Sequence, residues 1–132
     1  MIAHKKNGKI RVCIDPRELN KHLQRTPHPV LTVEGFLPDV RNAKVFSKCD
    51  VKNGFWHVGL DEASSRLLTF ATPCGRFRWT RMPFGIAPAP EIFQRRLEQQ
   101  LDGLPGVSNI HDDILIMGEG ETLEMAIDNH DK

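Results

Sequence analysis

The sequence lacks the features that mark several common protein classes. It has no tyrosine, only three cysteines and only two tryptophans among 132 residues. No apolar run approaches the roughly 20 residues that a membrane-spanning helix needs. The N-terminal stretch MIAHKKNGKIRV has no apolar segment of the kind found in signal peptides. We therefore expect an intracellular protein that does not bind membranes.

The few cysteines argue against a disulfide framework and against a zinc ribbon. Cys13, Cys49 and Cys74 are odd in number, far apart and free of any Cys-x-x-Cys pair. We expect them to be small buried apolar side chains.

The composition otherwise describes a globular chain of about one domain, with 39% hydrophobic and 27% charged residues. The net charge of +1 hides a polarity, because residues 1–25 carry +5 and residues 109–132 carry −6. A basic front end suits a polyanion, and an acidic back end suits cations or solvent. Merely solvated faces would show the same charges, so the motifs must decide.

Hydrophobic periodicity and turn signals predict a mixture of strands and helices. Strands are expected in 10–14, 43–51, 55–60, 66–73, 76–82 and on both sides of 111–113. The turn Lys52-Asn53-Gly54 would join the second and third strands, and Cys74-Gly75 would join the fourth and fifth. This order, without internal repeats, favours an α+β fold with helices behind a mostly antiparallel sheet.

Three helices are expected. A short one falls near 32–41, and a second starts near Pro90 and stops at Gly103. Its buried stripe follows the helical spacing of Phe93, Leu97 and Leu101. The last helix lies in 122–132 and places three residues on one face: Leu123, Ile127 and His130.

The stretch NIHDDILIMG, residues 109–118, sets two carboxylates in an apolar run. Unpaired charge is costly in such surroundings, so something must compensate Asp112 and Asp113. A tight hairpin would aim both at one place, and Asp50, at the end of another predicted strand, is the natural third member. Divalent cations make such a cluster tolerable. An Asp-Asp pair alone is also common in turns.

Four segments together resemble the reverse transcriptase of long-terminal-repeat retrotransposons, especially the gypsy-type elements. They are VCIDPRELNK (12–21), FSKCDVKNGFWHVGLDE (46–62), TFATPCGRFRWTRMPFGIAPAPEIFQ (69–94) and DDILI (112–116). The resemblance implies a polymerase palm with partial fingers, whose mostly antiparallel sheet is backed by helices. The fingers would take about 1–30 and 61–84, and the palm about 31–60 and 85–132.

The same resemblance implies the catalytic site. Asp50, Asp112 and Asp113 would be catalytic and would bind two Mg²⁺ ions, with Mn²⁺ as a substitute. Val51 would add its backbone carbonyl as a metal ligand. The activity implied is RNA- or DNA-templated addition of deoxynucleoside triphosphates to the 3′-hydroxyl of a primer.

The implied nucleotide pocket contains Arg11, which would contact phosphates, and guanidinium suits that task. Phe55 would be an aromatic gate that collides with a 2′-hydroxyl, and ordinary core packing is the alternative for this residue. The other implied pocket residues are Asn53, Gly54, Phe84 and Gly85. Further charge neutralisation is expected from three lysines: Lys5, Lys6 and Lys9.

Two positions depart from the family pattern. Ile110 stands where the family usually has tyrosine, which removes a hydroxyl contact. His111 should point away from Asp112 on an alternating strand, so we expect a structural role for it. Neither change removes a carboxylate.

The chain should also be a fragment. It lacks a thumb, RNase H and integrase, so the rest of a Pol polyprotein is the expected partner. We expect weak, salt-sensitive nucleic-acid binding and weak or absent activity. The location implied is a cytoplasmic virus-like particle or the nucleus.

Two other functions compete with this one. The chain could be a non-catalytic retroelement remnant that binds nucleic acid or a protein. A small metal-dependent nuclease ranks last, because it would not require MPFGIAPAP or the Phe55 gate.

Overall fold

The computed structural model describes residues 2–4, 8, 10–25, 27, 40, 42–110 and 113–132. The chain divides into two compact units. Unit 1 comprises Met1–Pro27 and Asn53–Phe93, and unit 2 comprises His28–Lys52 and Gln94–Lys132. The helix predicted near 32–41 lies outside the described residues, apart from Val40.

Unit 1 combines short hairpins with short helices. β1 (Ile2–His4) pairs antiparallel with β2 (Ile10–Val12), and β4 (Thr69–Thr72) pairs antiparallel with β5 (Gly75–Arg78). The predicted first strand and the hairpin about Cys74-Gly75 are thereby confirmed. Two six-residue helices were not predicted, because they are too short to show periodicity: α1 (Arg17–His22) and α3 (Glu62–Leu67).

The hairpin predicted at Lys52-Asn53-Gly54 is wrong. Residues Gly54–His57 form the 3₁₀ helix η1, and only Gly59 makes an isolated bridge, to Arg81, within the predicted strand. The left-handed backbone of Asn53 (φ 56°) starts a helical turn rather than a hairpin. The apolar residues of the predicted strand at 55–60 therefore belong to η1 and to the loop that follows it.

One helix spans a sequence boundary between the two units. α4 (Ala89–Leu101) begins where the sequence predicted it, and Phe93 on its stripe is 4% exposed. The other buried apolar residues of unit 1 among those described are Leu68, Met82, Pro83, Pro88 and Ala89. Gly103 follows the helix with a positive φ of 80°, which confirms the predicted stop.

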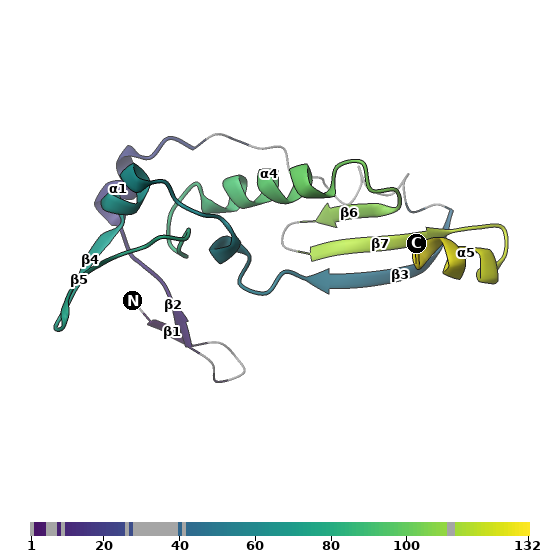
Figure 1. Cartoon of the computed structure of the whole chain (residues 1–132), viewed down its shortest axis with the longest axis horizontal. Coiled ribbons are helices and arrows are strands. Elements are labelled where there is room, and N and C mark those ends of the chain that lie inside the picture. The colour runs from purple at the N-terminus through teal and green to yellow at the C-terminus, as the bar shows by residue number, and fades with distance from the viewer. Residues whose placement is uncertain are drawn as a thin grey trace. The chain divides into compact units, whose positions relative to one another are not determined.

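Unit 2 is built on a three-stranded antiparallel sheet in the order β3-β7-β6. The strands are β3 (Ala43–Asp50), β6 (Val107–Ile110) and β7 (Asp113–Glu119). Helix α5 (Leu123–His130) packs on β7 and β3, as Figure 1 shows. Helix and antiparallel sheet together give the predicted α+β class.

Helix α5 buries a different face from the predicted one. Ala126 is fully buried, whereas Leu123 and Ile127 are 59% and 45% exposed. A Cβ at Gly118 would lie 2.1 Å from the Ala126 carbonyl oxygen, so glycine lets the helix approach the sheet closely. His130 is the predicted face residue that does pack inward, with Nε2 2.9 Å from Ser47 Oγ.

The cysteines are not the buried side chains that we expected. Cys49 and Cys74 are exposed and Cys13 is half-buried. Cys49 lies near the end of β3, and Cys74 lies in the β4–β5 turn, where neither position is covered. None of the described helices combines the length and the hydropathy that a membrane-spanning helix requires.

Candidate functional site

Two acidic residues face each other at strand ends in unit 2. β3 ends at Asp50, β7 begins at Asp113, and the antiparallel register pairs these two residues. Directly opposed residues on such a ladder project to one face with Cβ atoms about 5 Å apart. The ladder thus brings together two of the three predicted carboxylates. Asp112 and His111 lie outside the described residues.

A lysine that the sequence analysis missed joins this pair. Lys48 precedes Asp50 by two residues on β3 and therefore lies on the same face. Its Nζ is 2.7 Å from Asp113 Oδ2. The hydrogen bond and charge of Asp113, with a smaller contribution from Asp50, raise the pKa of Lys48 above its ordinary 10.5. Strand alternation was the signal that could have found it.

The donor atoms of the acidic pair fit a divalent cation. Mg²⁺ is usually held by one or two carboxylates together with waters and substrate phosphates. Asp50 and Asp113 supply such oxygens, and two opposed like charges favour a cation between them. Within the described part of the chain, no three His, Cys, Asp or Glu side chains gather as a metal site. The structure therefore carries the two-carboxylate part of the predicted triad.

The chain turns sharply just after Asp50. Half-buried Val51 leads into Asn53, whose left-handed backbone begins η1. A Cβ at Gly54 would lie 2.6 Å from Phe93 Cζ, so a side chain there would displace the ring. This explains the residue types that follow the first aspartate.

Phe55 lies half-buried in an aromatic cluster of unit 1. Its ring centroid is 4.8 Å from that of Phe84 and 5.6 Å from that of Phe93. Trp56 meets Phe84 edge-on at 6.3 Å. Tilted and edge-on contacts of this kind are favourable for aromatic rings. Packing therefore fixes the Phe55 ring, as a gate and a core residue would both require.

The loop that follows Phe84 is held by two other segments. The Ile14 N–H donates to the Phe84 carbonyl at 2.9 Å. Gly85 has a positive φ of 112°, and a Cβ there would lie 2.0 Å from the Ile14 oxygen. Asn20 donates to the Gly85 carbonyl and accepts from the Ala87 N–H, both at 2.9 Å. This clamp was missed because it comes from the unpredicted helix α1.

Of the basic residues, Arg11 lies in β2 opposite Ala3. The other predicted phosphate-neutralising residues, Lys5, Lys6 and Lys9, lie outside the described residues. The structure therefore describes the strand that carries Arg11, and the phosphate contacts of Arg11 stay a prediction.

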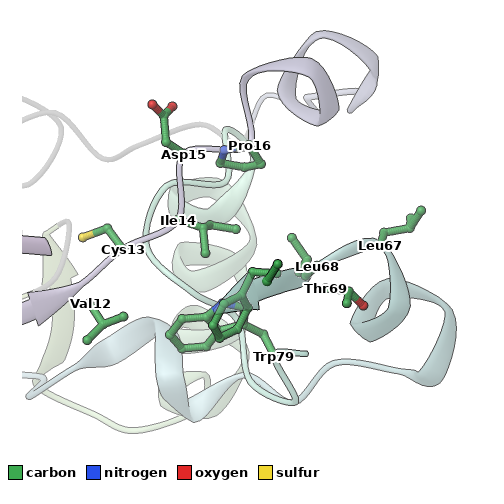
Figure 2. A pocket seen from close by; sticks show the side chains of 11 residues that line it. Val12, Cys13, Ile14, Asp15, Pro16, Leu67, Leu68, Thr69 and Trp79 are labelled. Carbon is green, nitrogen blue, oxygen red and sulfur yellow. The ribbon is translucent and has the colours of Figure 1, made fainter. Parts of the chain in front are cut away.

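A cavity of about 330 Å³ also lies in unit 1 (Figure 2). It is lined by the connection from β2 to α1 and by the junction of α3 with β4, including Ile14, Leu68 and Trp79. The Trp79 indole N–H is buried without a partner among the described residues. Figure 2 shows the Asp15 carboxylate pointing away from Trp79.

Comparisons with known proteins agree with these features. The sequence profile of the family described as "Reverse transcriptase (RNA-dependent DNA polymerase)" matches residues 3–130. The chain is 34% identical over 120 residues to the enzymatic polyprotein of Figwort mosaic virus (strain DxS), covering 90% of this chain and 18% of that protein. It is 36% identical over 115 residues to the retrovirus-related Pol polyprotein from transposon 412 of Drosophila melanogaster, covering 86% and 9%.

A solved structure shows the same likeness. The foamy viral protease-reverse transcriptase dRH, in complex with double-stranded DNA, superposes with a TM-score of 0.80 at 27% identity. The match covers 98% of this chain and 23% of that one. The chain belongs to the reverse transcriptase family, which confirms the resemblance drawn from its motifs. It spans less than a fifth of the two polyproteins that it matches.

Proposed function

We propose that the chain is the polymerase core of a reverse transcriptase, which adds deoxynucleotides to a primer 3′-hydroxyl on an RNA or DNA template. The observation that carries this proposal is the β3–β7 register, with Asp50 opposite Asp113 at two strand ends. Side chains on paired strands are held more rigidly than side chains on loops, which suits a site for transferring a nucleotide. The family match supports the same chemistry.

The proposed metal ligands are Asp50, Asp112, Asp113 and the Val51 carbonyl, which would hold two Mg²⁺ ions or Mn²⁺ in their place. When bound, such ions activate the attacking hydroxyl and stabilise the leaving oxygen. The chain's own contribution is to hold the carboxylates at fixed strand ends.

The proposed nucleotide pocket draws on Arg11 for phosphate binding and on Phe55 to exclude a 2′-hydroxyl. The rigid packing of Phe55 against Phe84 supports a gate, because a mobile ring would not discriminate between sugars. The backbone at Gly85, held by Asn20, would form another wall. Asn53 and Gly54 complete the proposed set.

We also propose that the chain works within a Pol polyprotein that supplies a thumb, RNase H and integrase. The short share of its polyprotein relatives that it spans supports this assignment. Fingers at about 1–30 and 61–84 and palm at about 31–60 and 85–132 remain part of the proposal. A cytoplasmic virus-like particle or the nucleus would be the compartment.

Primer extension on poly(rA) with oligo(dT), dTTP and Mg²⁺ tests the proposal. Asp113→Asn should lower extension by about a hundredfold or more, as expected for removal of a group that stabilises the transition state. The matched control is Asp128→Asn, which changes an exposed acid of unit 2 that pairs with Lys132. Extension that survives Asp113→Asn would contradict the assignment, and no extension by any form would favour a non-catalytic binding module.

The gate has its own test. Phe55→Val should raise incorporation of ribonucleotides relative to deoxynucleotides, because the smaller side chain leaves room for a 2′-hydroxyl. Phe77→Val changes a 51% exposed phenylalanine of the same unit and is the control. Unchanged sugar selectivity in a folded Phe55→Val protein would leave core packing as the role of this ring.

A further inference from the structure

The acidic pair of unit 2 already has a cationic partner within the chain. Lys48 Nζ lies 2.7 Å from Asp113 Oδ2, and Asp113 is the register partner of Asp50. Lys48, two residues before Asp50 on β3, shares the face of both carboxylates. The ammonium thus occupies an oxygen that a divalent cation would need.

This contact differs from an ordinary surface ion pair between one acid and one base, because two carboxylates lie beside Lys48. Two opposed carboxylates repel each other, so a nearby ammonium relieves the repulsion when no divalent cation is bound. The Lys48 side chain is 66% exposed, whereas that of Asp113 is 38% exposed. A lysine has a flexible four-carbon stem, so this ammonium can swing into solvent without moving β3.

We propose that Lys48 is a built-in counterion that competes with divalent cations for Asp113. The inference rests on the proposed cation site at Asp50 and Asp113 and adds the residue that sets its apparent affinity. Without a divalent cation, Lys48 offsets one of the two negative charges of the pair and stabilises the sheet end. When the cation binds, the ammonium leaves Asp113, and its positive charge nearby weakens the binding.

The same strand offers a matched control. Lys44 lies four residues before Lys48 on β3, at the register shift between Ala43 and Val45 and roughly 13 Å away along the strand. Its ammonium contacts the Glu121 carbonyl oxygen rather than a carboxylate of the pair. That distance exceeds the Debye length at physiological salt, so Lys44 should not influence a cation at Asp113.

The experiment measures Mn²⁺ binding by electron paramagnetic resonance in the full 132-residue chain. Lys48→Met should lower the apparent Kd for Mn²⁺ by about threefold to tenfold, because one positive charge leaves a divalent site. This gain should shrink as salt is raised. Lys44→Met should leave the Kd unchanged, and Lys48→Arg, which keeps a cation, should not tighten binding. Lys48→Gln repeats the test if Lys48→Met folds poorly.

Thermal unfolding gives a second readout that a purely structural lysine would not produce. With EDTA, Lys48→Met should unfold at a lower temperature than the wild type, because the carboxylates lose their counterion. With saturating Mn²⁺ the difference should vanish. A structural lysine would lower the unfolding temperature under both conditions.

The outcomes also separate this inference from the proposed function. If the wild type binds Mn²⁺, if Asp113→Asn weakens that binding and if Lys48→Met leaves it unchanged or weaker, Lys48 is no competitor and the cation site stands. If neither the wild type nor Lys48→Met binds Mn²⁺, the cation site itself is wrong and the inference falls with it.

Discussion

Carboxylates of the two units have different partners: Glu62 and Asp61 in unit 1 are bonded to donors, whereas Asp50 in unit 2 is opposite another acid. In unit 1, Glu62 accepts from Arg66 at 3.0 Å and from Arg78 at 2.6 Å, and Asp61 accepts from the Ser64 N–H at 2.7 Å. These contacts lower the pKa of both acids.

In unit 2, Asp50 instead stands opposite another acid, and a flexible lysine is the cation beside the pair. The acids of unit 1 are bonded to arginines or to a backbone amide, whereas the opposed pair of unit 2 is the proposed cation site.

Close backbone contacts give the largest expected effects, one in each unit. Gly118→Ala should destabilise unit 2 by about 3 kcal/mol, because its Cβ would meet the Ala126 carbonyl. Gly85→Ala should cost unit 1 a similar amount, since it adds a strained φ to a clash with Ile14. Hydrogen exchange should show lost protection first in the unit that carries the change.

Gly59→Ala is the control, because a Cβ at Gly59 meets nothing within 4 Å. It should stay within about 0.5 kcal/mol of the wild type. Equal loss of protection in both units from either variant would show that the units unfold together.

The Asn20 clamp of unit 1 consists of two hydrogen bonds that hold the loop at Gly85. Asn20→Ala should destabilise the unit by about 1–3 kcal/mol, because the Gly85 carbonyl and the Ala87 N–H both lose a partner. Asn20→Asp keeps the acceptor and loses the donor, so it should fall between the wild type and Asn20→Ala. Denaturant titration measures the free energy of unfolding of the three proteins and so gives their order. An unchanged value for Asn20→Ala would show that the loop at Gly85 does not depend on Asn20.

The link between α5 and β3 should matter less. Ser47→Ala removes the hydroxyl that His130 contacts at 2.9 Å and should cost unit 2 about 1 kcal/mol. A double-mutant cycle with His130→Ala measures the coupling directly. Additive losses in that cycle would mean that the contact contributes nothing of its own.

Acid should weaken the Glu62 contacts of unit 1, with the smallest effect of the series. Arg78 and Arg66 hold the pKa of Glu62 below its ordinary 4.5, so ionised Glu62 stabilises the folded state above that value. This contribution is lost as the pH falls through the lower folded-state pKa. Below about pH 4.5, the melting temperature of Glu62→Gln should fall less steeply with pH than that of the wild type. An equally steep fall in both proteins would show that the Glu62 contacts with Arg78 and Arg66 do not stabilise the folded state.

Long periodic elements could be predicted from the sequence, and short or locally strained ones could not. β3, the β4–β5 hairpin and α4 carry enough alternation or helical spacing to be found. Helices α1 and α3 have six residues each and bury almost nothing, so no stripe marks them. The strand expected at 55–60 failed because the Asn53 backbone and the Gly54–Phe93 contact decide the structure there.

The residues of the candidate site also divide into those that the sequence could predict and those that it could not. Its acids stand out because charge in an apolar run needs a reason. Lys48 and Asn20 do not stand out, because a surface lysine and a helix asparagine are common. Their roles depend on the strand register and on a contact between residues 65 positions apart.

Mn²⁺ added to the ¹⁵N-labelled chain in an NMR titration tests the proposed cation site at Asp50 and Asp113 most directly. This paramagnetic ion broadens the amide signals closest to it. We expect the signals of Asp50 and Asp113 to broaden first, at the facing ends of β3 and β7. Broadening that starts instead among the acids of residues 119–131, with Asp50 unaffected, would contradict it.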